Sequence, residues 1–505
     1  MSGAAISKRR DVVIVGGGIA GLAAAHRLAG SGRSRGQARA AGTRADAERT
    51  GGEDLHITLL EADERLGGKI RTETFAGRPL DVGAEALLAR VPAGLELCRE
   101  LGLDRDLLTP ANDQPFVWSD RLRPLPPRLL AGVPDGFRAV IASGILSPAG
   151  LARAGLDLII PARPPKEDVS IGSIVRRRLG AQTLARLIDP LLGGIHAGSC
   201  DELSVRAVAP QLEAALRKRR SLVRGLRALS GGPPRAPAAP AFLTLSGGLE
   251  ELVDALRREL GTIECRTGTA LESLRALPGG GARLMLADGD TLDADHVILA
   301  LPSFAAATLT AEACPQAAAE LEGIPYASVA TIALSYPSGA FERPLEGSGF
   351  LVTRTPGRTI TACTWSSVKW PHMAGETVLL KCSAGHAGNE RALELDDEQL
   401  VAAVRADLGR AMNLHAAPLQ SRVFRFERAL PQYEVGHLER IARIEAAMQQ
   451  QLPGVSLCGA AYRGVGVASC IRDGRAAADA VAATLRAGAA AEEQRAAARL
   501  VLTSN

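Results

Sequence analysis

A glycine-rich turn between an apolar run and a small-residue stretch limits the fold of this chain more than any other feature. Residues 12–28 read VVIVGGGIAGLAAAHRL, with Gly16, Gly18 and Gly21 at the glycine positions of G-x-G-x-x-G. In a strand-turn-helix unit these glycines permit the tight turn, the approach of the backbone to a pyrophosphate, and close packing of helix on strand. The helix N-terminus favours negative charge, because its amide groups are unpaired. The segment predicts a Rossmann-type dinucleotide-binding domain, whose cofactor-binding turn also includes Gly17, Ile19 and Ala20.

An acid at the end of the next apolar run supports the same fold. Residues 56–60 (HITLL) predict a second strand, and Glu61 follows it directly. In this fold an acid at that place hydrogen-bonds the ribose hydroxyls. The usual separation is about 20 residues, whereas Glu61 lies 40 positions beyond Gly21. Residues 30–54 have almost no large apolar side chain, so we expect a mobile surface insertion there. The alternative for Glu61 is a surface acid that merely ends a strand.

A second glycine turn follows Glu61 and narrows the choice of cofactor. The pair Gly67-Gly68 lies between Arg65 and Lys69 in the string ADERLGGKIRT. A nicotinamide-binding fold does not need this turn. The string resembles the R-x-G-G-[KR] signature of flavoproteins related to amine oxidases, desaturases and porphyrinogen oxidases.

The C-terminal region carries a matching signal. Residues 455–478 read VSLCGAAYRGVGVASCIRDGRAAA, which predicts a strand, a glycine-rich turn and a small-residue helix. In the flavoprotein superfamily this segment returns to the first domain and contacts the isoalloxazine and the ribityl chain. The resemblance therefore implies noncovalent FAD. Beyond the residues named above, it implies FAD contacts from Ala62, Gly83, Ala84, Glu85, Ala86, Ala270, Val465, Gly466 and Val467.

Further strings indicate a branch of that superfamily. In order along the chain they are LDVGAEALLAR (80–90), IDPLLGGIHAG (188–198), LSGGLEEL (245–252), GSGFLV (347–352), SVKWPH (367–372) and YRGVGVASCI (462–471). Together they resemble the porphyrinogen oxidases of haem biosynthesis, specifically the bacterial protoporphyrinogen/coproporphyrinogen III oxidase group, over about residues 11–485. An amine oxidase would instead carry an aromatic Trp-Ser-Gly-Tyr-like string where this chain has Arg463 to Val467.

The resemblance also implies a substrate pocket. Gly349, Phe350 and Leu351 are expected to line the pocket over the flavin, and Arg90 is the candidate partner of a substrate propionate. The alternative for Arg90 is a solvated surface arginine. The catalytic residues stay open, since oxidation of an electron-rich porphyrinogen requires no protein acid or base.

The expected reaction is the oxygen-dependent oxidation of coproporphyrinogen III to coproporphyrin III, and the same group also acts on protoporphyrinogen IX. Removing six hydrogens takes three two-electron cycles of FAD. In each cycle dioxygen reoxidises the reduced flavin and is converted to hydrogen peroxide. The porphyrin would then pass to a ferrochelatase. The alternatives are a protoporphyrinogen IX oxidase proper, another amine-oxidase-like flavoenzyme, and a flavin-binding scaffold without turnover.

The predicted fold class is α/β (α+β overall): a discontinuous Rossmann-type FAD-binding domain and a substrate-binding domain with a mixed sheet and a helical part. We expect FAD-binding segments at 1–94, 242–305 and 425–486. The substrate domain would take 95–241 for its helical part and 306–424 for its sheet. Residues 487–505 form an alanine-rich tail.

Composition excludes several other classes of function. The net charge of +4 and an aromatic content of 3% do not indicate nucleic-acid binding. The eight cysteines and eight histidines are scattered, so we expect no metal site and reduced thiols. The first ten residues lack the apolar centre of a signal peptide, and no run approaches the roughly 20 apolar residues of a membrane span. We expect a cytoplasmic protein with at most peripheral membrane contact.

Overall fold

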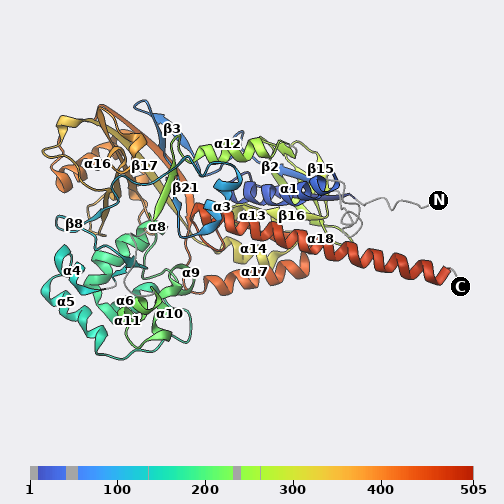
Figure 1. Cartoon of the computed structure of the whole chain (residues 1–505), viewed down its shortest axis with the longest axis horizontal. Coiled ribbons are helices and arrows are strands. Elements are labelled where there is room, and N and C mark those ends of the chain that lie inside the picture. The colour runs from blue at the N-terminus through green and yellow to red at the C-terminus, as the bar shows by residue number, and fades with distance from the viewer. Residues whose placement is uncertain (1–8, 41–54, 135, 231–239, 262, 504–505) are drawn as a thin grey trace.

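The computed structural model describes residues 9–40, 55–134, 136–230, 240–261 and 263–503. Figure 1 shows a nucleotide-binding part that contains α1 and α18, a second part built on the long strands β17 and β21, and a helical lobe below it that contains α4 to α11. Helices and sheets are mixed along the chain, which confirms the α/β (α+β) class.

A five-stranded parallel sheet forms the centre of the nucleotide-binding part. Its strand order is β12-β2-β1-β16-β22. Because its strands come from three distant stretches of the chain, the predicted assembly from discontinuous segments is confirmed. The strands are β1 (Arg10–Val15), β2 (Leu55–Leu60), β12 (Glu264–Arg266), β16 (His296–Leu299) and β22 (Val455–Leu457).

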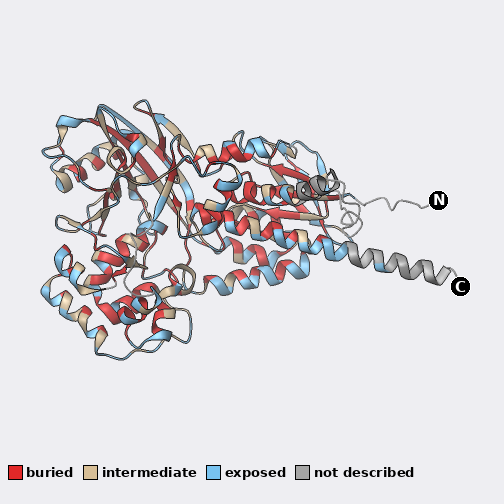
Figure 2. Cartoon of the chain, in the orientation of Figure 1, coloured by how far each residue is buried: buried red, intermediate tan, exposed pale blue. Residues whose placement is uncertain are grey.

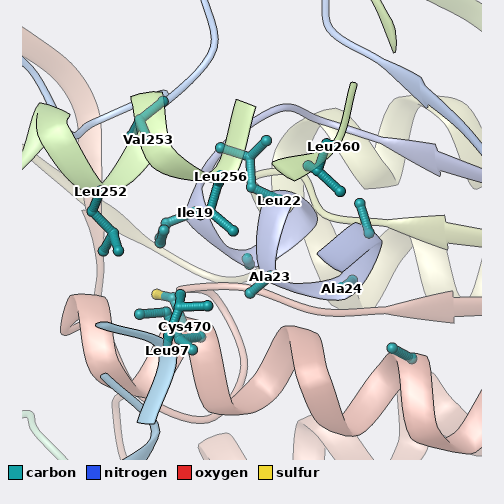
Figure 3. Close-up of a cluster of buried hydrophobic side chains, with 14 of the residues drawn as sticks. Ile19, Leu22, Ala23, Ala24, Leu97, Leu252, Val253, Leu256, Leu260 and Cys470 are labelled. Carbon is teal, nitrogen blue, oxygen red and sulfur yellow. The ribbon is translucent and has the colours of Figure 1, made fainter. Parts of the chain in front are cut away.

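Alternation along β1 sends its side chains into two different cores. Val12 and Ile14 pack with α1, α3, α12 and α18, a cluster drawn in part in Figure 3. Val13 and Val15 pack on the other face, against α13, α14, α17 and the β13–β15 sheet. The apolar part of β1, residues 12–15, is therefore covered on both sides. The helices are α1 (Ile19–Ala40), α3 (Pro92–Glu100), α12 (Glu250–Glu259), α13 (Ser303–Thr310), α14 (Pro315–Glu322), α17 (His437–Gln451) and α18 (Val467–Thr503), and the three strands are β13 (Leu271–Ala276), β14 (Ala282–Leu286) and β15 (Thr291–Ala294).

Helix α1 is longer than the sequence indicated. The predicted insertion begins at residue 30, but residues 30–40 continue the helix. This part of the predicted surface insertion is therefore helical, as a continuation of the buried first half of α1. Residues 41–54 lie outside the described residues.

A seven-stranded sheet carries the second part. Its order is β21-β17-β20-β19-β18-β7-β8, antiparallel except where β18 runs parallel to β7. One face packs on α16 (Asp397–Met412), whose N-terminus has a capping box made by Asp396 and Gln399. The strands are β7 (Pro115–Trp118), β8 (Leu122–Pro124), β17 (Tyr326–Pro337), β18 (Gly349–Val352), β19 (Ile360–Trp365), β20 (Thr377–Ala384) and β21 (Gln420–Pro431).

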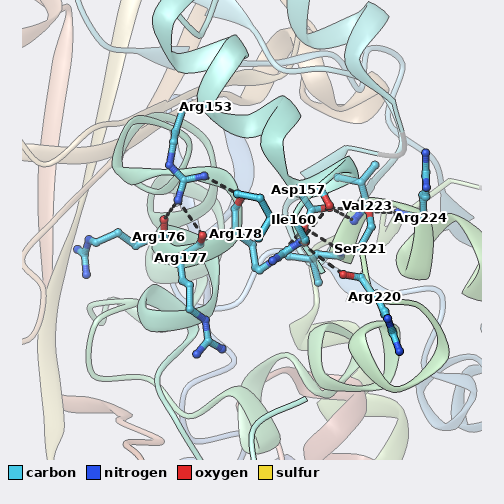
Figure 4. A network of polar contacts seen from close by, with 11 residues as sticks. Arg153, Asp157, Ile160, Arg176, Arg177, Arg178, Arg220, Ser221, Val223 and Arg224 are labelled. Carbon is cyan, nitrogen blue, oxygen red and sulfur yellow. Dashed lines mark hydrogen bonds and ion pairs between the residues drawn. The ribbon is translucent and has the colours of Figure 1, made fainter. Parts of the chain in front are cut away.

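The helical lobe has its own apolar core and a buried ion pair. The Asp157 carboxylate accepts hydrogen bonds from Arg178 Nε at 2.7 Å and Ser221 Oγ at 2.7 Å, and from two backbone amides that begin α11 (Figure 4). Every buried charge there is paired, as burial requires. The helices are α4 (Phe137–Ser143), α5 (Pro148–Gly155), α6 (Ile171–Leu179), α7 (Ala181–Thr183), the π-helical stretch η2 (Leu184–Gly193), α8 (Gly194–His196), α9 (Val205–Val208), α10 (Pro210–Lys218) and α11 (Leu222–Leu229).

The buried residues, coloured red in Figure 2, lie in the interiors of these parts. The first core extends past residue 94 to include Leu97, Cys98 and Leu103, and α13 and α14 belong to the second core of the nucleotide-binding part. We therefore propose moving the domain boundaries to about 103 and 325. Among the described residues, no helix has the length and apolar character needed to cross a membrane.

Candidate active site

A cavity of about 510 Å³ lies where the parallel sheet meets the seven-stranded sheet. The strands of the parallel sheet end at this cavity, the place where ligands bind in open α/β folds. Predicted residues that line it are Gly16, Gly18, Ile19, Ala20, Glu61, Lys69, Gly83, Ala84, Val465 and Val467. They come from four stretches of the chain, so the fold brings together most of the predicted cofactor contacts.

The three glycines of the first turn meet different surroundings. A Cβ on Gly16, whose φ is +107°, would lie 2.6 Å from the Ala300 carbonyl oxygen, and a Cβ on Gly21 would lie 2.0 Å from the Gly16 carbonyl oxygen. A Cβ on Gly18 would meet no described atom within 4 Å, because this position opens onto the cavity. A larger residue at Gly16 or Gly21 would therefore distort the fold, whereas one at Gly18 would fill space that a ligand can use.

Glu61 joins the first glycine turn to the second. Its carboxylate accepts a hydrogen bond from Gly17 N at 2.6 Å and another from Asp63 N at 2.9 Å. The two turns also touch directly, since Gly67 N donates to the Gly17 carbonyl at 2.8 Å. Two lone-pair positions of the carboxylate remain for other donors.

Arg65 and Lys69 flank the second turn and have different contacts: Arg65 bonds to the backbone of the turn, and Lys69 lines the cavity. Arg65 donates to the carbonyls of Leu66, Ile70 and Gly68, so it braces the turn and does not line the cavity. Lys69 lines the cavity, where Nζ donates to the Ala429 carbonyl and lies 6.0 Å from the Tyr326 ring centroid. Burial lowers the pKa of Lys69. Lys69 thus places a basic side chain at the cavity wall, where the Ala429 carbonyl holds its Nζ.

Glu85 follows the lining residues Gly83 and Ala84 but points away from the cavity. Its Oε1 accepts from Lys369 Nζ at 2.6 Å and from Trp370 Nε1 at 2.8 Å, and its other oxygen pairs with Lys381. Burial opposes ionisation of this carboxyl, but the two ammonium groups hold its pKa well below its usual range. Glu85 therefore fastens the turn to the seven-stranded sheet.

The C-terminal turn borders the cavity beside the first glycine turn, since a Cβ on Gly459 would lie 3.9 Å from the Ala20 Cβ. Gly459 N donates to Asp473 Oδ2 at 2.8 Å, and the Gly466 carbonyl accepts from the amides of Ser469 and Cys470 at the start of α18. Burial raises the pKa of Cys470, a cavity-lining thiol, to about 12. A neutral thiol is a poor nucleophile.

The structure corrects the expected pocket strand. The Phe350 side chain is buried in the core on the α16 side, with ring contacts to Trp118 and Trp365. A Cβ on Gly349 would lie 2.2 Å from the Cys363 carbonyl oxygen, so this glycine serves the close approach of two strands. Leu351 packs against the helical lobe. Gly349 and Phe350 are therefore not among the residues that line the described cavity: the Phe350 ring is turned into the core on the α16 side, and Gly349 lies against the backbone of β19.

Arg90 is exposed in the turn after β5 (Leu87–Leu88), apart from the lining residues. The other predicted contacts outside the lining are Gly17, Gly21, Ala62, Ala86, Ala270 and Gly466.

The wall that the seven-stranded sheet contributes to the cavity contains residues that were not predicted from the sequence. Thr331, Thr361 and Ser383 lie on β17, β19 and β20, and Thr361 Oγ1 donates to the Ser383 carbonyl at 3.2 Å. Gly194 and Ala197 of the α8 region face them across the cavity. The sequence signal that could have identified them is a small polar residue within an otherwise apolar strand.

Comparison with known proteins agrees with this geometry. Residues 19–482 match the family described as flavin containing amine oxidoreductase, and the chain belongs to that family. The predicted FAD cofactor is thereby confirmed, and the glycine turns, the open position at Gly18 and the cationic Lys69 fit a dinucleotide.

Two curated relatives with high coverage are porphyrinogen oxidases. The chain is 36% identical to coproporphyrinogen III oxidase of Bacillus subtilis (93% of this chain, 97% of the relative) and 31% identical to bovine protoporphyrinogen oxidase (94% of this chain, 99% of the relative). A crystal structure from Exiguobacterium sp. 255-15 superposes with a TM-score of 0.80 at 32% identity, covering 94% of this chain and 99% of that one. The porphyrinogen-oxidase resemblance of the sequence is confirmed.

Proposed function

We propose that the chain oxidises coproporphyrinogen III to coproporphyrin III, with protoporphyrinogen IX as a second substrate. The observation that carries the proposal is the single cavity that joins the glycine turns to the short side chains of the seven-stranded sheet. The similarity to coproporphyrinogen III oxidases over 93% of the chain supports this choice of substrate. Bovine protoporphyrinogen oxidase, at 31% identity, supports the second.

The residues of the nucleotide end would hold noncovalent FAD. The backbone at Gly18 admits the pyrophosphate, the free lone pairs of Glu61 accept the ribose hydroxyls, and Lys69 offsets phosphate charge. Bound FAD supplies two-electron oxidation, so removal of six hydrogens takes three rounds with dioxygen as acceptor and hydrogen peroxide as product.

The residues of the sheet end would position the macrocycle. Thr331, Thr361, Ser383 and Gly194 are small, and they leave room for a flat ring system. Within the described lining, Glu61, Asp63, Lys69 and Cys470 belong to the turns around the nucleotide end and the closing turn. The sheet contributes Tyr326, whose hydroxyl accepts a hydrogen bond from Ser303 N at 2.9 Å. The chain therefore acts by holding one ring against another and by excluding water. The porphyrin product is a substrate for iron insertion, so we propose a ferrochelatase as the next partner.

Anaerobic titration of the holoenzyme tests this proposal. Each porphyrinogen is added in turn to the oxidised flavoprotein, and the flavin absorbance is followed before and after oxygen is admitted. We expect coproporphyrinogen III to bleach the flavin fastest and oxygen to restore it with release of peroxide. Bleaching by neither compound would indicate a flavin-binding scaffold, and a clear preference for protoporphyrinogen IX would reverse the order of substrates.

A further inference from the structure

Tyr433 lies between β21 and α17, and its hydroxyl holds the closing turn of the cavity from two sides. The hydroxyl donates to the Ala460 carbonyl at 2.6 Å and accepts from Gly464 N at 2.7 Å. Ala460 lines the cavity, and Gly464 has φ of +136°. The side chain is 1% exposed. One phenol therefore satisfies a carbonyl and an amide on either side of the bend.

The ring of Tyr433 is itself held in place. It stacks on the His437 imidazole, with centroids 4.0 Å apart and an interplanar angle of 14°. His437 Nε2 lies 3.1 Å from the Tyr462 carbonyl oxygen, to which it donates. Burial lowers the pKa of His437 to about 4, so this ring is neutral near pH 7. The phenol is thus fixed by a second ring that also contacts the closing turn.

The Tyr433 carbonyl and the side chain of its neighbour Gln432 also contact the helical lobe. The Tyr433 carbonyl accepts from Ser204 N at 2.7 Å, and Gln432 Nε2 donates to the His196 carbonyl at 2.8 Å. His196 ends α8, which supplies Gly194 to the cavity, and Ala197 follows it. The dipeptide Gln432-Tyr433 therefore connects the closing turn with the substrate-side helix.

Tyr462 provides a natural contrast within the same turn. Its side chain is fully buried, like that of Tyr433, but its hydroxyl has no hydrogen-bond partner among the described residues. Removing that hydroxyl removes no observed bond, and loss of an unsatisfied polar group is close to neutral.

From these contacts we propose that Tyr433 is a positioning residue, which sets the closing turn against the flavin and keeps it at a fixed separation from α8. The inference rests on FAD as the cofactor of this cavity, and it extends the proposed function to a residue outside the cavity lining. Without the phenol oxygen, the Ala460 carbonyl and the Gly464 amide lose their shared partner, and the closing turn can move relative to the first glycine turn.

The test compares Tyr433→Phe with Tyr462→Phe in the full-length holoenzyme. Tyr433→Phe keeps the stacked ring and removes only the two hydrogen bonds. We expect about tenfold weaker FAD affinity, faster flavin release and a shift of the visible flavin absorption bands, since a tenfold loss corresponds to about 1.4 kcal/mol, within the range of two net hydrogen bonds. Tyr462→Phe should stay within twofold of the unsubstituted protein.

Wild-type flavin affinity and spectrum in Tyr433→Phe would overturn the proposal. Equal effects of the two substitutions would also overturn it, because they would reflect packing in general. So would a lower melting temperature in Tyr433→Phe without any change in flavin affinity or spectrum. None of these flavin measurements needs a porphyrinogen, so failure here is distinguishable from failure of the proposed substrate.

Discussion

The two ends of the cavity are built by different means. At the nucleotide end, backbone geometry and hydrogen bonds determine many positions. A Cβ on Gly21 would lie 2.0 Å from a carbonyl oxygen, the Glu61 carboxylate accepts from Gly17 N, and Gly67 N donates to the Gly17 carbonyl. At the sheet end, Thr331, Thr361 and Ser383 determine mainly how much space remains. A ligand shared by many proteins can be recognised through backbone contacts, whereas a particular substrate is selected by cavity shape.

Gly18→Val tests the nucleotide end most severely. Its side chain would extend into the cavity without touching the described protein atoms, so the chain should fold and lose nearly all of its flavin. Flavin content and melting temperature of the apoprotein measure the two effects separately. Gly21→Val is the matched control, because its clash with the Gly16 carbonyl should reduce folding as well. Full flavin occupancy in Gly18→Val would place the pyrophosphate elsewhere.

Thr361→Trp tests the sheet end. An indole at this position would occupy the substrate side of the cavity, so porphyrinogen turnover should fall at least a hundredfold while flavin content remains normal. Thr361→Val keeps the volume and removes only the hydroxyl, and it should stay within a few-fold. Steady-state peroxide release and flavin absorbance check both variants. Loss of flavin in Thr361→Trp would contradict the separation of the two ends.

Glu85→Gln should weaken the connection between the two ends. Removing one charge leaves two buried ammonium groups without their partner, which should cost about 3–5 kcal/mol of unfolding free energy. Because the folded pKa of Glu85 is held low, its contribution is complete above the ordinary pKa of a glutamate and is lost as the pH falls through the folded value. Urea unfolding at several pH values should show the two proteins converging in acid. Glu73→Gln, near the surface, should cost ~1 kcal/mol or less.

Glu61→Ala should lower FAD affinity by about 1.5–3 kcal/mol, the range of a charge-assisted hydrogen bond. Glu61→Gln keeps one acceptor oxygen and should fall between the alanine variant and the unsubstituted protein. Equilibrium titration of the apoproteins with FAD measures both. Unchanged affinity in both variants would mean that Glu61 only joins the two turns.

The smallest effect concerns Arg90. It is exposed and lies apart from the described cavity lining, so we propose that it is a solvated surface arginine. Arg90→Ala should leave the KM for coproporphyrinogen III within about twofold. A KM that rises tenfold with kcat unchanged would restore Arg90 as a propionate partner, because such a contact lies far from the reacting carbon.

The features that could be predicted from the sequence are those that depend on residues close together along the chain. The structure has Gly16, Gly18 and Gly21 in the turn between β1 and α1 and Glu61 directly after β2, as the strand and turn signals predicted. Their contacts with FAD stay a prediction. The helical continuation through residues 30–40 was not predicted, because this stretch contains three glycines and no large apolar residue.

Long-range relations could not be predicted in this way. Glu85 pairs with Lys369 and Lys381 because the seven-stranded sheet and the helix beside it pack against the turn at residues 83–86. These partners lie about 300 positions away along the chain. The side of the sheet to which the Phe350 side chain points depends on the register between β18 and β19. A shift of this register by one residue would move each β18 side chain to the opposite face of the sheet.

The strand order of the parallel sheet has a consequence for synthesis on the ribosome. β1 pairs Val12 with His296, and β22 joins β16 from residue 455 onward. At the usual translation rates of about 5–20 residues per second, roughly 15 to 60 s separate the synthesis of β1 from that of β16, its second neighbour in the sheet. The apolar edge of a nascent chain stays open for that time, and the closing turn emerges last. Cofactor capture is therefore a late event, and the cell must protect the growing chain until almost its final helix has been made.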